Sequence, residues 1–322
     1  MSVSVRVAAL LALVHLAAPA AAQSYPTQTI KIVVAYAPGG TGDIVARLIA
    51  VPLAAALGQS VVVENRAGAT GAIGTQAVVS AAPDGHTLLL GQTGEISINQ
   101  HWIKGLTYDA AKDLQPIALA SVVPLALVVS SKSTISSMDE MAKVLADKKA
   151  LTFASAGTGT PGHFAGEFLK LRTGANLTHV PYKGAGPALN DLLGGHVDMY
   201  FPGIPAAMPH VKSRAMRMLA VSSSSRSSAT PNIPTVAEAI GDKQFDVTLW
   251  QGFFAPKATP KPIVDRLNRE INRILESRDM QTRLRDAGAD VRTMSVDQFA
   301  AFAHAESDKY LQIIKESGVK PE

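Results

Sequence analysis

The sequence predicts an α/β fold of two lobes, each a mostly parallel sheet flanked by helices, and three observations lead to this prediction. At roughly 150 residues a domain, a chain of 322 residues suggests two domains. Short apolar runs alternate with apolar residues at helical spacing, an order that supplies the crossover helices that parallel strands need. Twice, a strand-like run leads into a loop rich in glycine and threonine that opens a helix. This recurring order indicates two lobes of similar construction that face each other.

The chain is expected to pass between the lobes twice. Residues 23–124 and 250–322 are predicted to form the first lobe, and residues 125–249 the second. The two hinge-crossing segments are predicted near 122–127 and 247–252. The C-terminal helices need a sheet to cover, and the first lobe is expected to provide it.

Strands and helices alternate in both predicted lobes. In the first lobe we expect a strand, a loop and a helix within 29–58, a strand at 60–64, a helix at 71–82 and a strand at 86–91. A long strand-like stretch at 117–130, interrupted by Pro124, comes before the second set, in which we expect strands at 151–155, 177–182 and 197–201 and helices at 137–149, 163–172 and 187–193. Pro52 is expected to kink or divide its helix. Amphipathic helices are predicted at 260–277 and 295–317, the second with a capping box of Ser295 and Gln298.

Composition and motifs exclude several classes of site. The chain has no cysteine, so disulfides, thiolate metal sites and cysteine nucleophiles are ruled out. Its net charge is +4 and its basic residues are scattered, so no nucleic-acid partner is expected. The motifs of a hydrolase elbow, a P-loop and a zincin are absent. His163 and Glu167 could meet on a helix, but they lack a third ligand, and no metal or other cofactor is predicted.

The first 22 residues have the pattern of a secretory signal peptide. One charge at Arg6 precedes an apolar run at 7–16, and the small residues at 20–22 follow. The apolar run is shorter than the roughly 20 residues of a membrane-spanning helix. The mature protein is therefore expected to begin at Gln23 and to act in the periplasm.

Two loops are the candidate binding elements. They are APGGTGD at 37–43 and SAGTGTPG at 155–162, and each follows a strand and opens a helix. Successive glycines let backbone N–H groups point inward, and the positive end of a helix favours an anion. Loops at the carboxyl ends of strands in two facing lobes would share a crevice. The competing interpretation is ordinary turn chemistry with helix capping by Asp43 and Thr160.

Three other features have weaker functional interpretations. The glycine series within 68–74 lacks the spacing of a dinucleotide-binding loop and is better explained by close helix packing. Glu95 could enter the crevice and meet a cationic group of a ligand, although an exposed position is favoured. Trp102 and Trp250 are expected in the core or at the hinge, and an aromatic wall against a ligand ring is the alternative.

The sequence resembles the Bug-type substrate-binding proteins of tripartite tricarboxylate transporters. The resemblance covers the chain from about Tyr25 to its C-terminus, with the segments in the family's order. It rests on YPTQTIKIVVAYAPGGTGDIVAR, VVVENRAGATGAIGTQAVVSAAPDGHTLLLG, SAGTGTPGHFAGEF, HVPYKGAGPALNDLLGGHVDMYF, LAVSSSSRSSATPNIPTVAEA and WQGFFAPKATPKPIVDRLN.

The resemblance implies a periplasmic-binding-protein fold and a receptor rather than an enzyme. Such a receptor closes over a small carboxylate, aliphatic or aromatic, and delivers it to the permease subunits in the membrane. It needs no cofactor, and a monomer is expected. Backbone N–H groups and small polar side chains would hold the carboxylate. Carried over to this sequence, the ligand-binding residues are Gly39, Gly40, Thr41, Asp43, Gln92, Thr93, Ser155, Gly157, Thr158, Thr160 and His163.

Departures from the family's pattern concern the far end of the ligand. Many members place an Asp-Asn pair where this chain has Pro202 and Gly203, and these two residues complete the predicted site. Glu95 stands where a small neutral residue is common. The name of the transporter therefore does not fix which carboxylate is bound.

Three alternatives share the same crevice. An enzyme could use His163 as base and Ser155 or Thr158 as nucleophile, but no third triad member can be named. A ligand-sensing domain of a transcription regulator is disfavoured by the signal peptide. A periplasmic sensor for a signalling system would bind the same ligand, and the sequence does not separate it from a transport receptor.

Overall fold

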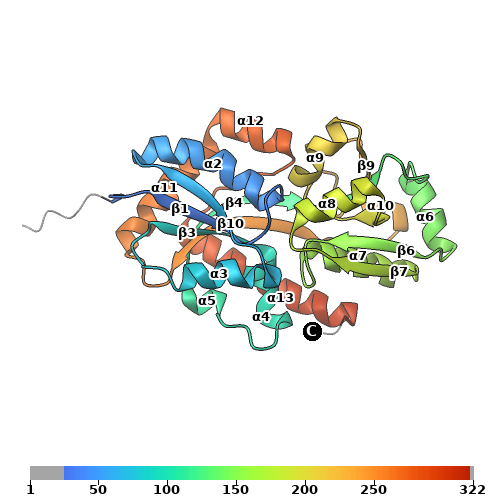
Figure 1. Ribbon diagram of the computed structural model, residues 1–322, viewed down its shortest axis with the longest axis horizontal. Coiled ribbons are helices and arrows are strands. Elements are labelled where there is room, and N and C mark those ends of the chain that lie inside the picture. Colours follow the sequence, from blue (N-terminus) through green and yellow to red (C-terminus); the bar gives the residue numbers. More distant parts are fainter. Residues whose placement is uncertain (1–24, 320–322) are drawn as a thin grey trace, which may run out of the picture.

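The computed structural model describes residues 25–319. The predicted signal peptide at 1–22 and the predicted start at Gln23 lie outside the described residues. Two five-stranded sheets flanked by helices make up the molecule, which confirms the predicted fold class. Figure 1 shows the first sheet in the left half of the view and the second in the right half.

The two sheets have the same topology, as the recurring order of elements predicts. Their strand orders are β2-β1-β3-β10-β4 and β7-β6-β8-β5-β9. In each sheet the fourth strand, β10 or β5, runs antiparallel to both neighbours, and the other four strands point the same way. The strands are β1 Ile30–Val34, β2 Val61–Asn65, β3 Thr87–Gln92, β4 Leu114–Pro124, β5 Ala126–Ser130, β6 Leu151–Ser155, β7 Leu177–Pro181, β8 Met199–Tyr200, β9 Met216–Val221 and β10 Thr248–Pro256.

Each crossing between the sheets leads directly into an antiparallel strand. β4 ends at Pro124 in the first sheet, and β5 begins in the second after the single residue Leu125. On the return, Val247 still bonds to the second half of the molecule through Ser222, and β10 starts at the next residue. The lobe boundaries predicted from the sequence describe which residues move together, and they stay a prediction.

The helices pack on both faces of the sheets. They are α2 Thr41–Leu57, α3 Ala72–Val79, α4 Asn99–Trp102, α5 Ala110–Asp113, α6 Met138–Ala146, α7 Pro161–Thr173, α8 Ala185–Gly194, α9 Ile204–Lys212, α10 Val236–Ile240, α11 Lys261–Glu276, α12 Arg278–Ala287 and α13 Val296–Ser317, with short turns η2 Ala69–Gly71 and η3 Gly94–Ile98. The expectation that Pro52 divides its helix is wrong, because α2 continues through it. Burial of Ile49 and Leu53 on either side of Pro52 holds the helix against the sheet despite the missing N–H. Helix α9 and strand β9 were not predicted.

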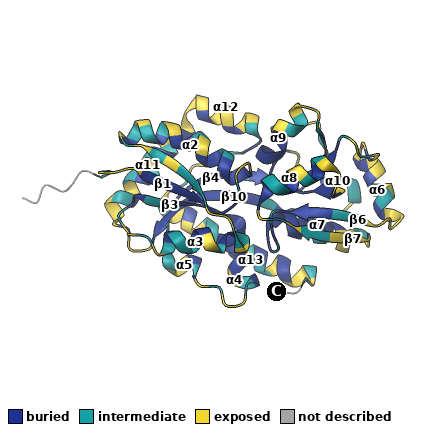
Figure 2. Ribbon diagram, viewed as in Figure 1, coloured by how far each residue is buried: buried dark blue, intermediate teal, exposed yellow. Residues whose placement is uncertain are grey.

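Strand β1 is buried on both of its faces. Ile30, Ile32 and Val34 belong to one buried cluster, whereas Val33 and Ala35 belong to another. Both faces of the strand are therefore covered, as expected for parallel strands between layers of helices. In Figure 2 the inner strands are dark blue, the edge strands β2 and β7 are mostly teal and yellow, and exposed residues follow the outer sides of the helices.

Helix α13 connects the two halves of the molecule along one side (Figure 1). The Tyr310 hydroxyl donates to the carbonyl of Thr248 at 2.6 Å, and the Tyr310 ring lies 6.3 Å from that of Phe164 on α7. The expectation that the C-terminal helices cover only the first sheet is therefore too narrow. The capping box at Ser295 and Gln298 is present as predicted.

Loss of this capping box should weaken α13 measurably. In Ser295→Ala the N–H of Gln298 loses its acceptor, so we expect the free energy of unfolding to fall by about 1 kcal/mol. Urea denaturation of both proteins measures it. Ser225→Ala is the control, because that serine is exposed and its hydroxyl makes no hydrogen bond within residues 25–319. Equal losses in the two variants would contradict a role for the cap.

Candidate functional site

A cavity lies between the two sheets where their parallel strands end. Its volume is about 530 Å³, including the part that is open to solvent. Seven predicted site residues line it: Gly40, Thr41, Asp43, Gln92, Thr160, Pro202 and Gly203. Its lining also includes residues that the sequence analysis did not name, among them Tyr36, Gly42, Leu125, Gly162, Ala185, Tyr200, Phe201 and Leu249.

The first turns or N-caps of four helices form part of the cavity wall. Lining residues occur at the start of α2, α7, α8 and α9. The first N–H groups of a helix have no partner within it, and the N-terminus carries a partial positive charge. Helices α7, α8 and α9 each have a proline in their first turn, which removes one donor, whereas α2 has none there. The start of α2 therefore offers the fullest set of N–H donors to an anion.

Asp43 organises the loop before α2. Its Oδ2 accepts the N–H of Gly39 at 3.1 Å, and its Oδ1 accepts from Nε of Arg47 at 2.9 Å. Burial alone would raise the pKa of Asp43, but the hydrogen bonds from Arg47 and Gly39 outweigh it and hold that pKa below its usual value. The N-cap position itself belongs to Gly40, so the prediction of Asp43 as N-cap is wrong while its role as loop organiser is confirmed.

Three buried polar side chains line the cavity without a hydrogen bond to other described residues. Thr41, Gln92 and Tyr200 are only 4%, 6% and 1% exposed. Their hydroxyl and amide atoms are not among the fully enclosed polar atoms without a partner, so they open onto the cavity. There they are free to bond to a polar ligand. The position of Tyr200 in a strand of two residues gave the sequence analysis no signal to find it.

The remainder of the wall is apolar. Leu125 and Leu249 come from the two crossings, and Phe201 and Pro202 follow β8. The lining contains no lysine, arginine or histidine. An anion in this cavity therefore meets helix ends and neutral donors and no formal positive charge.

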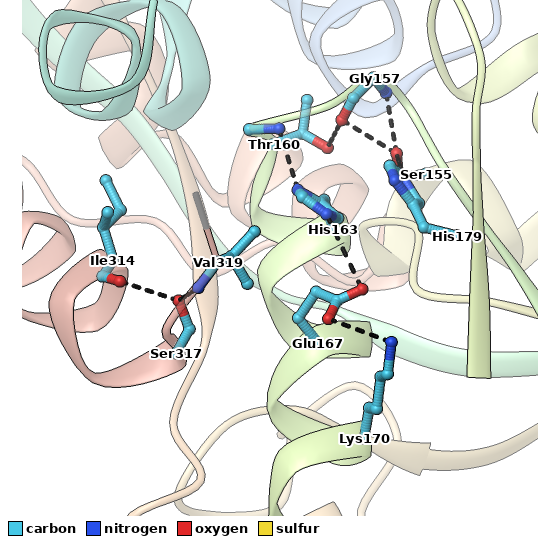
Figure 3. Close-up of polar contacts among 11 residues, drawn as sticks. Ser155, Gly157, Thr160, His163, Glu167, Lys170, His179, Ile314, Ser317 and Val319 are labelled. Atoms are coloured by element: carbon cyan, nitrogen blue, oxygen red, sulfur yellow. Dashed lines mark hydrogen bonds and ion pairs between the residues drawn. The ribbon is translucent and has the colours of Figure 1, made fainter. Parts of the chain in front are cut away.

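The loop after β6 is held together by its own side chains (Figure 3). Ser155 Oγ accepts the N–H of Gly157 at 3.1 Å and lies 2.6 Å from Nε2 of His179. The Thr160 hydroxyl donates to the Gly157 carbonyl at 2.7 Å and makes no capping bond to α7. Ser155 and Gly157 thus shape the loop and do not line the cavity. Thr160 occupies the N-cap position of α7, so the capping interpretation is right for the position and wrong for the side-chain bond.

His163 also acts inside this loop. Its Nδ1 accepts the N–H of Gly159 at 3.1 Å, and its ring stacks on that of His179 at 4.0 Å (Figure 3). Burial, followed by the charges of His179 and Lys170, lowers the pKa of His163 to about 3, so the ring is neutral at pH 7. The partner of the Ser155 hydroxyl is His179, which the sequence analysis missed. Within residues 25–319, His163 makes no hydrogen bond to Ser155 or Thr158, the two nucleophiles of the enzyme alternative.

Thr93 and Thr158 have structural contacts that explain their positions. The Thr93 hydroxyl accepts the N–H of Trp250 at 2.8 Å, so it fixes η3 to β10. The Thr158 carbonyl accepts the hydroxyl of Thr70 at 2.9 Å across the crevice. Gly39, with φ of 82°, permits the turn before α2, and its N–H is used by Asp43. The structure does not place these three residues in the lining of the cavity.

Glu95 lies behind the cavity wall. Its side chain is 1% exposed, and Oε1 accepts the N–H of Gln92 at 2.8 Å. Both interpretations of Glu95 from the sequence are wrong, because the side chain neither faces solvent nor lines the cavity. Burial raises the pKa of Glu95 to about 8. The start of η3 folds the carboxyl back beneath Tyr36, a tertiary contact that no local pattern indicates.

Two glycines allow the halves of the molecule to touch around the cavity. A Cβ on Gly203 would lie 2.3 Å from Oγ1 of Thr41, and a Cβ on Gly186 would lie 2.4 Å from the carbonyl oxygen of Pro38. Neither glycine has a positive φ, so only space requires glycine there. The Thr70–Thr158 hydrogen bond joins the same two halves. The two halves are thus in direct contact beside the cavity.

Two negative findings apply to residues 25–319. No helix in that range is long and apolar enough to cross a bilayer. In the same part of the chain, no three His, Asp or Glu side chains are grouped as metal ligands.

The two sheets share one topology, are joined by two crossings and enclose a cavity lined by helix N-termini. This arrangement defines a two-lobed binding protein. Comparison with known proteins identifies which kind. Residues 45–319 match the family described as "Tripartite tricarboxylate transporter family receptor". The chain belongs to this family of solute-binding receptors, which confirms the resemblance found in the sequence.

Individual relatives agree with this assignment. Protein BugT of Bordetella pertussis is 38% identical over 312 residues, covering 96% of this chain and 95% of BugT. The structure described as R. palustris Rpa4515 with adipate has a TM-score of 0.89 at 32% identity and covers 92% of this chain and all of that one. MatC from Rhodopseudomonas palustris with bound malate has a TM-score of 0.83 at 33% identity, covering 90% of this chain and all of MatC.

The buried carboxyl of Glu95 should make stability depend on pH. Its folded-state pKa of about 8 lies above the ordinary 4.5, so its contribution to the free energy of unfolding falls as pH rises from about 4.5 through about 8. Glu95→Gln removes this titration and should lose less stability than the wild type between pH 5 and pH 9. Urea denaturation at several pH values measures the difference. Parallel pH profiles would contradict the buried, protonated state.

Proposed function

We propose that the protein is a periplasmic receptor that closes over a small carboxylate, aliphatic or aromatic, and delivers it to the permease of a tripartite tricarboxylate transporter. The observation that carries the proposal is a single cavity in which helix N-termini meet three buried polar side chains without partners. Adipate and malate in the structures of two relatives support a carboxylate. The predicted signal peptide supports the periplasm.

The two lobes would share the carboxylate. On the first lobe, Thr41 and Gly42 begin α2 and offer their N–H groups. The Gln92 side-chain amide lies beside them, since a Cβ added to Gly42 would be 2.9 Å from it. On the second lobe, Gly162 opens α7, and a Cβ there would lie 3.8 Å from the Tyr200 ring. One carboxylate oxygen held by each lobe gives binding energy that exists only when the lobes are together. Ligand binding would therefore stabilise the closed arrangement.

Loss of the Tyr200 hydroxyl should weaken the ligand without disturbing the fold. Tyr200→Phe keeps the buried ring and removes a donor to a charged acceptor, so we expect the Kd for the tightest carboxylate to rise about tenfold or more. A melting-temperature screen of residues 23–322 finds that carboxylate, and calorimetric titration gives the Kd.

Tyr25→Phe is the matched control, since its hydroxyl donates to Gly85 before β3, at the end of the sheet away from the cavity. An unchanged Kd in Tyr200→Phe would remove this residue from the site. The absence of any carboxylate that raises the melting temperature would contradict the receptor itself.

Gly186→Ala should separate closure from folding. Alanine suits the first turn of α8 better than glycine, so the ligand-free melting temperature should be equal or higher. The added Cβ would meet the Pro38 carbonyl at 2.4 Å in the closed arrangement, so ligand affinity should fall at least about tenfold. Calorimetric titration and ligand-free melting together test it. An affinity equal to that of the wild type would mean that the ligand is held without this contact.

A further inference from the structure

Building on the proposed carboxylate receptor, we propose that this cavity selects ligands with a single carboxylate and an otherwise uncharged, largely apolar body. It should reject both a second carboxylate and an ammonium group at the far end of the ligand. The inference rests on which polar groups of the wall are free and which are already bonded.

The free donors are concentrated at the helix starts. Thr41 and Gly42 begin α2, and the side chains of Gln92 and Tyr200 adjoin the starts of α2 and α7. Each of these side chains is more than nine-tenths buried and lacks a hydrogen bond within the described part of the chain. One carboxylate can accept several of these donors at once. The first carboxylate of the ligand therefore uses the free donors at the starts of α2 and α7.

The backbone groups of the apolar wall at Leu125 and Pro202 are already bonded. The Pro202 carbonyl accepts the N–H of Ala126 at 2.8 Å, and proline has no N–H of its own. The N–H of Leu125 donates to the Ser222 hydroxyl at 2.9 Å, and the Leu125 carbonyl accepts the N–H of Ser222 at 2.9 Å. Leu249 lies within β10, paired with β4. A second carboxylate packed on these residues would lose its water and find no cation.

An ammonium group would find no free carboxylate in the cavity. Asp43 is the one carboxylate in the cavity lining, and Arg47 and the Gly39 N–H already bond to it. Glu95, the other nearby carboxyl, does not reach the cavity and bonds to the N–H of Gln92. An amino acid would bury its ammonium among Leu125, Leu249 and neighbouring apolar groups. Burial of an unpaired charge is costly whatever its sign.

Three related ligands test the inference on the wild-type protein. Hexanoate, adipate and 6-aminohexanoate share one carboxylate and four methylene groups, and they end in a methyl, carboxylate or aminomethyl group. 4-Methylbenzoate, terephthalate and 4-(aminomethyl)benzoate repeat the comparison for aromatic ligands. Calorimetric titration of residues 23–322 at pH 7.5 should give a Kd for the monocarboxylate at least about tenfold lower than for both other members of its series.

The outcomes are distinguishable. If adipate or terephthalate binds as tightly as its monocarboxylate partner, the inference is overturned while the carboxylate receptor stands. If the amino-substituted acid binds most tightly, the inference is also overturned, because the cavity must then supply a countercharge. If none of the six binds and no other carboxylate raises the melting temperature, the inference and the proposed function fail together.

A charge placed in the apolar wall should invert the preference. Leu249→Lys puts an ammonium group beside the ligand's far end, so adipate should gain at least about tenfold relative to hexanoate. Leu171→Lys is the control, because Leu171 is 51% exposed on α7 and does not line the cavity. Melting temperatures establish that both variants fold, and the wild-type series decides the question if Leu249→Lys does not. An unchanged preference in a folded Leu249→Lys would place the far end of the ligand elsewhere and overturn the inference.

Discussion

The unpaired N–H groups at the start of α2 are the constraint on which the rest of the site depends. In an open crevice, water satisfies these groups. Where the lobes meet, as they do through the Thr70–Thr158 bond, these donors face the cavity between them, where an acceptor can bind. A bound anion supplies one. The cavity lining contains no lysine, arginine or histidine, so a bound anion forms no ion pair there. Its binding energy comes instead from hydrogen bonds to the helix N-terminus.

Close approach of the two lobes depends on positions without side chains. Gly203 leaves room for the Thr41 hydroxyl, and Gly186 leaves room for the backbone at Pro38. Both glycines sit at helix starts with ordinary backbone angles, so their small size serves the contact between lobes and not the local turn. Because Gly186 has no side chain, the backbone of α8 can approach the backbone at Pro38. A donor on one lobe can then reach a ligand already held by the other.

The sequence predicted the architecture and the two loops but only part of the site. Glycine and threonine at fixed places after strands carry a local signal, which is why Gly40, Thr41 and Thr160 were found. Ser155 and His163 were predicted as ligand contacts, yet Ser155 Oγ bonds to His179 and His163 Nδ1 accepts the N–H of Gly159. The parallel pairing of β6 with β7 brings His179 beside that loop, and such a partner depends on tertiary register.

The same limit explains the residues that were missed. Tyr200 belongs to a strand of two residues, and only the arrangement of β8 between β6 and β5 aims it at the cavity. Leu125 and Leu249 fall in the crossings predicted near 122–127 and 247–252, but no local pattern indicated that these crossings line the cavity. The apolar wall is thus built partly from the two segments that join the sheets. A ligand body packed on this wall would contact both crossings.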